Sequence, residues 1–166
     1  TQALMGEALT VFDISSGWAW VQLAADGYVG YVREEATREG ASEATHVVSV
    51  PRSFVYPGAD LRFPHLQTLS MGSRVRIVGE AETRGTPYAL LEDGSAIIDT
   101  HLRRVDETAA EDAVAVAARF IDTPYLWGGR TGFGIDCSGL VQLALAMTGL
   151  SAPRDSDQQA AGLGSV

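Results

Sequence analysis

The amino-acid sequence predicts a mixed fold in which two small β-barrels are followed by an incomplete α+β domain. Three observations support this prediction. Residues 1–105 consist of short apolar runs separated by turn-forming pairs, which is typical of small barrels. Residues 106–149 show two helical patterns on either side of a glycine-rich loop. The residues that follow contain no strand pattern that could cover the second helix.

The first barrel is expected at residues 1–35, and the sequence leaves open whether its N-terminal part is complete. Apolar, β-branched and aromatic residues form three short runs there, at residues 8–12, 19–23 and 28–32. A Ser-Gly pair and an Asp-Gly pair divide the runs, and such pairs favour tight turns between antiparallel strands. The pattern therefore predicts three strands joined by two turns.

The second barrel is expected at residues 42–105. Gly and Pro again divide the predicted strands, which are residues 74–78, 88–91 and 96–98. The two barrels look like a divergent repeat, because Met5-Gly6 begins the first series of strands and Met71-Gly72 begins the second. The charged, alanine-rich residues 33–46 are the expected connector.

The third segment, residues 106–166, is predicted to be the N-terminal part of an α+β domain. A first helix is expected at residues 107–121, with apolar residues at positions 110, 113, 114, 117, 120 and 121. A second is expected at residues 138–148, between Asp136 as N-cap and Gly149 as its end. This second helix is apolar on every face, which is typical of a fully buried helix. We therefore expect that a covering sheet follows these residues in the parent protein.

Charge and composition exclude several classes of function. The net charge of −9 opposes nucleic acid and anionic membrane as partners. The sequence has no apolar run near the roughly 18–20 residues of a membrane span. A single cysteine excludes an internal disulfide and any multi-cysteine metal site, and no His, Asp or Glu cluster has ligand spacing. We therefore expect no metal and no cofactor.

Cys137 is the residue on which the functional interpretation depends. An isolated cysteine is often a small core hydrophobe. Cys137, however, begins the second predicted helix, where the free N–H groups and the helix dipole stabilise a thiolate. Asp136 and Ser138 flank it, and the preceding loop carries Tyr125, Trp127 and several glycines that allow the backbone to approach a ligand. These neighbours favour a nucleophilic cysteine.

The segment "TPYLWGGRTGFGIDCSGLVQLAL" resembles the nucleophile segment of the NlpC/P60 cysteine peptidases, whose fold is papain-like. The two β repeats resemble bacterial SH3 (SH3b) domains, and "PRDSDQQ" fits the stretch that follows the nucleophile helix in the family. Within the family, the sequence is similar to γ-D-glutamyl-L-diamino acid endopeptidases with N-terminal SH3b domains. Those enzymes cleave murein stem peptides between D-Glu and the diamino acid and prefer a free N-terminal L-Ala.

The resemblance implies a set of site residues, with Cys137 as the nucleophile. The implied substrate-binding residues surround the L-Ala end of the peptide and are Tyr125, Asp136, Ser138, Asp155, Ser156, Glu7 and Tyr28. The alignment of the last two is looser, because Glu7 is equally interpreted as a solvated strand-end charge and Tyr28 as a barrel aromatic. Arg154 is interpreted simply as the partner of a nearby carboxylate.

The catalytic base is where the sequence departs from the family. A thiolate peptidase needs a histidine that forms the ion pair and protonates the leaving amine. In the family this histidine and its orienting partner follow the nucleophile, whereas His46, His65 and His101 all precede Cys137. We assign none of the three to catalysis and expect residues 1–166 alone to be inactive.

The resulting hypothesis is a cysteine endopeptidase that hydrolyses the γ-D-glutamyl-L-diamino acid bond of murein stem peptides. One alternative is a non-catalytic cell-wall-binding protein in which the SH3b repeats bind and the cysteine is a relic. Another is a papain-like amidase or acyltransferase. A preference for free L-Ala favours cytoplasmic recycling of peptides, although a periplasmic or secreted protein is also compatible with the sequence. The diamino acid and the oligomeric state stay open.

Overall fold

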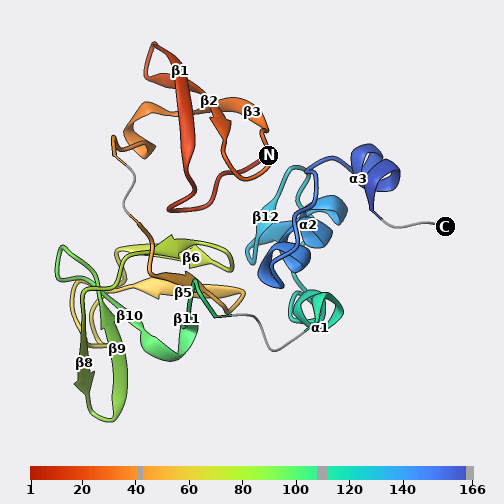
Figure 1. Ribbon diagram of the computed structural model, residues 1–166. Coiled ribbons are helices and arrows are strands. Elements are labelled where there is room, and N and C mark those ends of the chain that lie inside the picture. Colours follow the sequence, from red (N-terminus) through yellow and green to blue (C-terminus); the bar gives the residue numbers. More distant parts are fainter. Residues whose placement is uncertain (41–42, 108–111, 164–166) are drawn as a thin grey trace.

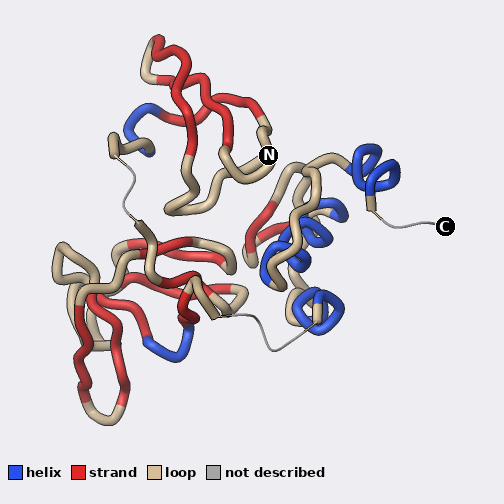
Figure 2. The backbone as a smooth tube through the Cα atoms, in the orientation of Figure 1, coloured by secondary structure: helices blue, strands red, loops and turns tan. Residues whose placement is uncertain are grey.

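The computed structural model describes residues 1–40, 43–107 and 112–163. Strands dominate the first two of these ranges, whereas the three α-helices lie in the last (Figure 1, Figure 2). The structure therefore has the mixed composition that the sequence predicts. The N-terminal strands, the second group of strands and the helices form three groups in space, and the chain passes through them in that order (Figure 1).

The N-terminal sheet is a three-stranded antiparallel meander in the order β1-β2-β3. Its strands are β1 (Leu9–Ser15), β2 (Trp18–Leu23) and β3 (Val29–Arg33), and a short 3₁₀ turn, η1 (Glu34–Ala36), follows. Ser16 and Gly17 join the first two strands with φ values of 53° and 76°, which is the geometry of a tight hairpin turn. The three predicted runs are thus confirmed as strands.

The second group of strands forms three small sheets, in the orders β11-β4-β7, β5-β6 and β10-β9-β8. The elements are β4 (His46–Val48), β5 (Arg52–Val55), β6 (Gln67–Ser70), β7 (Arg74–Val75), β8 (Gly79–Thr83), β9 (Thr86–Leu90), β10 (Ala96–Ile98), η2 (Asp99–His101) and β11 (Leu102–Arg104). Their buried side chains form one apolar cluster, made of Val48, Val55, Leu69, Val75 and Ile97.

The two expected barrels are not confirmed, because the described strands form open sheets of two or three strands and close no barrel. The predicted strand at residues 74–78 shows one reason. Only Arg74 and Val75 pair with β4, and then Val78 N donates to Leu90 O in the neighbouring sheet. The apolar run therefore passes from one sheet to another and does not form one continuous strand.

The first helix is shorter than predicted. Helix α1 spans Ala113–Ala118, and the Asp112 side chain caps it by accepting a hydrogen bond from Ala115 N at 2.8 Å. Residues 108–111 of the predicted helix lie outside the described residues. The apolar face is also rotated, because Val116 is buried whereas Val114 is 78% exposed.

Helix α2, which begins with Cys137, spans Cys137–Met147 and so agrees with the prediction to within one residue. It follows a short hairpin of β12 (Arg130–Thr131) and β13 (Gly134–Ile135), and α3 (Ser156–Gly162) comes after it. The described residues bury α2 only in part, since Val141 is 41% exposed and Ala146 is exposed. Burial of the remaining face by a sheet that follows these residues in the parent protein stays a prediction. The described residues cover the side of α2 that carries Leu143 and Met147 and leave Val141 open to solvent.

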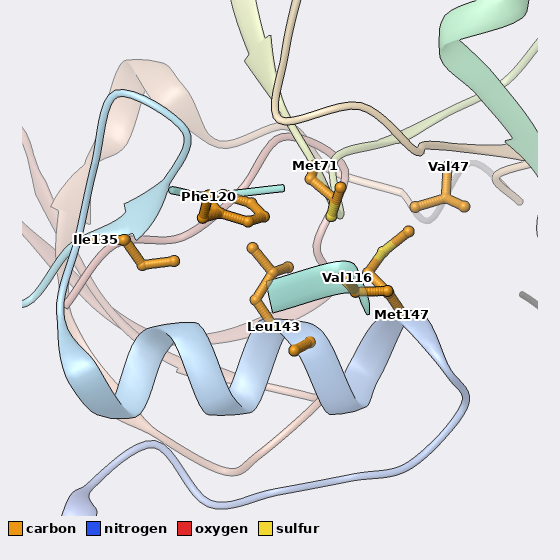
Figure 3. Packing of buried hydrophobic residues seen from close by; sticks show 8 residues of the cluster. Val47, Met71, Val116, Phe120, Ile135, Leu143 and Met147 are labelled. Carbon is orange, nitrogen blue, oxygen red and sulfur yellow. The ribbon is translucent and has the colours of Figure 1, made fainter. Parts of the chain in front are cut away.

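The core beneath α2 is shared between the helices and the second group of strands (Figure 3). It consists of Val47, Met71, Val116, Phe120, Ile135, Leu143, Ala144 and Met147. Val47 and Met71 come from the strand region and lie over α2 together with Phe120 and Val116 (Figure 3). The second group of strands therefore packs against α2 and helps to hold it in place. Among the described residues, no helix is long and apolar enough to cross a membrane.

Candidate active site

Cys137 is the first residue of α2, and its free thiol is exposed to solvent. The preceding residue, Asp136, is the N-cap, and its Oδ1 accepts a hydrogen bond from Gly139 N at 2.7 Å. Gly139 has no space for a side chain, because a Cβ there would lie 2.4 Å from Gly129 O. The glycine-rich loop is thus packed directly against the first turn of the helix, which fixes the position of the thiol.

The Tyr125 side chain lies beside the Cys137 thiol, whose charge and hydrogen bonding act on the tyrosine pKa. A parallel bridge between Tyr125 and Ile135 brings the loop alongside the residues that precede α2. Partial desolvation, the negative charges of Cys137 and Asp136, and the hydrogen bond to Cys137 raise the pKa of Tyr125, while Arg154 opposes them. Tyr125 therefore keeps its proton and can donate it to a thiolate.

Asp136 and Arg154 form a buried ion pair, with Arg154 Nη2 2.7 Å from Asp136 Oδ2. Gly128 N donates to the same oxygen at 2.8 Å, and Ser138 Oγ lies 3.4 Å from Oδ1. Arg154 also donates to Ser138 Oγ at 2.8 Å. The two residues that flank the cysteine are consequently engaged with one arginine and with backbone amides.

These contacts decide the protonation of Asp136. Burial by itself would raise the pKa of its carboxyl group. The hydrogen bonds from Arg154, Gly139 and Gly128 and the charge of Arg154 outweigh burial, so the pKa lies below its ordinary value. Asp136 is therefore ionised at neutral pH and acts as a fixed negative charge beside the thiol.

Helix α3 is tied to the start of α2 through Gln159, whose Nε2 donates to Ser138 O at 2.9 Å and to Pro153 O at 2.8 Å. These two contacts hold the "PRDS" stretch close to Ser138, and hence to Cys137. Asp155 is the N-cap residue of α3, but its half-buried carboxylate makes no capping bond, and Ser156 is exposed. Both side chains are free of hydrogen-bond partners within the part of the chain that the structure describes.

Glu7 and Tyr28, the two candidate residues from the N-terminal region, lie in different surroundings. Glu7 is bound by Arg130, with Arg130 Nη2 3.0 Å from Glu7 Oε1, and Glu7 Oε2 accepts from Leu4 N at 2.7 Å. Tyr28 lines a separate cavity of about 150 Å³ that is formed by N-terminal residues. The structure thus places Tyr125, Asp136 and Ser138 around the cysteine. Glu7 is paired with Arg130 instead, and Tyr28 lines the separate cavity.

Two buried arginines belong to the site in ways that the sequence analysis does not specify. Arg154 pairs with a carboxylate, as expected, and its partner is Asp136, the residue next to Cys137. The sequence analysis assigns no role to Arg130. Its position inside the glycine-rich loop is the available signal, because an arginine is rarely buried without a carboxylate partner.

The histidines and a second cavity lie away from Cys137. His46, His65 and His101 contact Thr45, Phe54 and Ser53, respectively. The cavity, of about 760 Å³, is lined by residues that flank the strands of the N-terminal sheet, by the second group of strands and by the C-terminal half of α2, and Cys137 does not line it. Within the described ranges, no group of three or more His, Cys, Asp or Glu residues could hold a metal ion.

Comparison with known proteins agrees with this geometry. Residues 1–36 match the bacterial dipeptidyl-peptidase Sh3 domain, and residues 122–165 match the NlpC/P60 family. The matched range contains the Tyr125 loop, Cys137, Arg154 and Gln159, and so every residue of the polar network around the thiol lies within this segment except Thr1, which accepts from Arg154 Nε.

Three curated proteins are similar to this chain and are longer than it. The gamma-D-glutamyl-L-lysine dipeptidyl-peptidase of Bacillus cereus is 27% identical over 96% of this chain and 53% of its own length. The enzyme of the same name from Bacillus subtilis is 28% identical over 96% of this chain and 57% of its own length. The dipeptidyl-peptidase 6 of Lysinibacillus sphaericus is 27% identical over 87% and 59%. The chain thus spans little more than half the length of these relatives.

Two solved structures align with the fold of this chain. The crystal structure of an NlpC/P60 family protein from Bacillus cereus aligns with a TM-score of 0.80 and 26% identity, covering 100% of this chain and 60% of that one. An NlpC/P60 endopeptidase from Photobacterium damselae aligns with a TM-score of 0.58 and 20% identity, covering 92% and 35%. The second likeness concerns the fold alone.

Proposed function

We propose that the full-length protein is a cysteine endopeptidase that hydrolyses the γ-D-glutamyl-L-diamino acid bond of murein stem peptides. One observation supports this proposal above all. The exposed thiol of Cys137 stands at the first turn of α2, hydrogen-bonded to Tyr125 and flanked by an ionised carboxylate, within an NlpC/P60 segment. The names of the curated relatives, which specify a gamma-D-glutamyl-L-lysine bond, support the choice of bond.

The proposed chemistry is acyl transfer through the thiol. Cys137 Sγ attacks the γ-carbonyl carbon of D-Glu, and the amide C–N bond breaks as the amine of the diamino acid leaves with a proton. Water then hydrolyses the thioester, which releases L-Ala-D-Glu with a free γ-carboxylate and restores the Cys137 thiol. The residue that accepts the thiol proton and delivers it to the leaving amine is expected to follow Cys137, as the family resemblance implies. The Tyr125 hydroxyl stabilises the thiolate before attack.

The free L-Ala ammonium is proposed to bind beside the thiol. Tyr125 and Ser156 offer exposed hydroxyl groups, and Asp155 offers a carboxylate that forms no hydrogen bond within the described residues. Asp136 and Ser138 lie at the buried side of this group, where Arg154 neutralises part of the negative charge. When the ammonium group binds, it loses hydrogen bonds to water. A charge-assisted hydrogen bond to the half-buried Asp155 carboxylate replaces them.

The substrate assay decides the proposal. Full-length protein should release the diamino acid from L-Ala-γ-D-Glu-L-Lys or from the meso-diaminopimelate peptide, and Cys137→Ala should lose this activity by several orders of magnitude. N-acetylation of L-Ala should lower kcat/KM by roughly 30-fold or more, because it leaves a carboxylate unpaired. Retained hydrolysis by Cys137→Ala overturns the nucleophile assignment, and equal rates on both peptides overturn the ammonium site.

The surroundings of the site are proposed from the resemblance. Residues 1–35 and 42–105 are proposed as two SH3b-like modules, and residues 106–166 as the N-terminal part of the catalytic domain. The partner is a murein stem peptide, and neither nucleic acid nor membrane is involved. A requirement for free L-Ala places the role in cytoplasmic recycling, which detection of the protein in cell fractions will test.

A second candidate function, binding to the cell wall, is favoured by the outer face of the N-terminal sheet. Trp18, Trp20 and Tyr31 are all exposed there, and Phe12 packs against Trp20 with ring centroids 5.5 Å apart. Aromatic rings of this kind can stack on sugar rings. Co-sedimentation with purified sacculi distinguishes the functions, because Trp20→Ala should abolish sedimentation if binding is the role and should leave hydrolysis of free peptides intact.

A further inference from the structure

Arg130 joins the segment that precedes β1 to the loop that precedes Cys137. Its guanidinium makes two bonds to Glu7, from Nη2 to Oε1 at 3.0 Å and from Nη1 to Oε2 at 3.2 Å. Arg130 N and Nη1 also donate to Oε1 and O of Gln2, at 2.8 and 3.0 Å. The side chains are only 7% and 10% exposed for Arg130 and Glu7. A bidentate pair at this depth fixes both partners in one geometry.

From Arg130 the contacts lead directly to the first turn of α2. Arg130 pairs with Ile135 in the β12–β13 hairpin, and Ile135 is two residues before the cysteine. The carbonyl of the neighbouring Gly129 accepts a hydrogen bond from Asp136 N at 3.2 Å. The Arg130 Cγ atom lies 3.6 Å from where a Cβ of Gly139 would stand. Arg130 therefore lies against the start of α2 on one side and contacts Gln2 and Glu7, which precede β1, on the other.

We propose that Arg130 is a positioning residue for Cys137 and that Glu7 acts by holding Arg130 in place. This inference rests on the proposed peptidase function and adds the means by which the segment that precedes β1 takes part in it. Gln2 and Glu7 of this segment fix Arg130, and Arg130 fixes the Gly129 carbonyl and the capped turn from which the thiol projects. The N-terminal segment thus becomes a structural part of the catalytic centre.

The proposal gives Glu7 a role different from that of a substrate ligand, and kinetics separate the two. A ligand of the L-Ala ammonium acts on binding, so that Glu7→Gln would raise KM for the free peptide and leave the N-acetylated peptide unaffected. A partner of Arg130 acts on geometry. Glu7→Gln and Arg130→Met should then each lower kcat about tenfold to 100-fold on both peptides, because small displacements of reacting groups are costly.

A double-mutant cycle tests whether the two residues act as a unit. The double variant should be little worse than either single variant, because the second substitution removes a contact that is already lost. Arg130→Lys keeps the charge but not the two-pronged geometry and should recover only part of kcat. Additive losses, or an effect on KM alone that is confined to the free peptide, overturn the proposal.

Alkylation of Cys137 by iodoacetamide gives a readout that does not depend on peptide hydrolysis. Glu7→Gln and Arg130→Met should each slow labelling at neutral pH at least threefold, because a loosened N-terminal turn stabilises the thiolate less. Leu69→Ala, which destabilises the separate strand cluster, and Arg76→Met, which breaks an exposed pair with Glu92, should leave the labelling rate unchanged.

The two proposals can fail separately. If intact full-length protein does not hydrolyse the peptide, the proposed function fails, while the labelling rates still decide the role of Arg130. If hydrolysis is confirmed but labelling is the same in Glu7→Gln, Arg130→Met and the native protein, the positioning role is wrong. If labelling slows equally in Leu69→Ala, the slower labelling is explained by general destabilisation, and the positioning role of Arg130 is wrong.

Discussion

The Asp136 carboxylate and the Arg154 guanidinium form an ion pair that is almost completely shielded from water, with 9% and 3% of the side chains exposed. The pair lies at the first turn of α2, beside Cys137, because Asp136 is also the N-cap of this helix. One carboxylate thus serves both the helix and the contact with the "PRDS" stretch. This double use makes Asp136 the most consequential single residue for the integrity of the site.

Asp136→Asn should destabilise the protein by about 3–5 kcal/mol, because it leaves the buried charge of Arg154 unpaired. Urea denaturation followed by tryptophan fluorescence measures the loss. Arg76→Met is the matched control, since it breaks an ion pair whose side chains are 49% and 53% exposed. That control should cost no more than about 1 kcal/mol. Equal losses in the two variants would contradict the structural role of the buried pair.

The same pair predicts a dependence of stability on acid. The pKa of Asp136 lies below its ordinary value of 3.8 in the folded protein. A carboxyl group with a lowered folded pKa stabilises the native state above its unfolded pKa, and this contribution disappears as pH falls through the folded pKa. The free energy of unfolding should therefore fall below about pH 4, the ordinary range of an Asp pKa.

Asp136→Asn provides the comparison for the acid experiment. The variant has no carboxyl group to titrate at this position, so its stability should fall less steeply than that of the native protein over the same acidic range. Urea denaturation at a series of pH values below 6 gives both curves. Parallel curves would show that Asp136 makes no contribution to the acid dependence.

Tyr125 predicts a pair of opposite titration shifts. The charge of Cys137 and the hydrogen bond to it raise the pKa of Tyr125, whereas Arg154 lowers it. Cys137→Ala should therefore move the Tyr125 titration downward, and Arg154→Met should move it upward. Carbon-13 NMR of tyrosine-labelled protein follows the ring carbon that bears the hydroxyl. An upward shift or no shift in Cys137→Ala would mean that Tyr125 and Cys137 are not in contact.

The local features of the fold could be predicted from the sequence. The run at residues 96–98 coincides with β10, and α2 begins one residue from its expected start, because Asp136 is an unambiguous N-cap signal. Other strands carry no such signal. The sequence Gly-Glu-Ala-Glu-Thr of β8 is poor in β-formers and is a strand only because it pairs with β9.

Long-range pairing explains what the sequence could not give for the site. Cys137, Tyr125, Asp136 and Ser138 are close in sequence, so their motif was sufficient to find them. The pair between Glu7 and Arg130 joins residues 123 positions apart, and no local pattern records such a contact. The exposure of Val141 likewise depends on what packs against α2, which helical periodicity alone does not reveal.

Gly132 gives the sharpest test of how the glycine-rich loop is seated. Gly132 N donates to Ser70 Oγ at 2.8 Å, and a Cβ at this position would lie 2.1 Å from Pro51 O. That oxygen belongs to the backbone, so it can yield only if the hairpin moves away from the strand region. Gly132→Ala should therefore cost about 1–3 kcal/mol or more through overpacking, and it should displace the loop that leads to Cys137.

Gly30→Ala is the matched control, because the same substitution in β3 meets nothing within 4 Å and requires no positive φ. Alanine there should change stability by no more than about 1 kcal/mol. Urea denaturation gives the two free energies, and alkylation of Cys137 by iodoacetamide reports whether the loop has moved. The packing argument requires that Gly132→Ala alone alters both quantities. If its stability and labelling rate match those of Gly30→Ala, the hairpin does not rest on Pro51 as the structure shows.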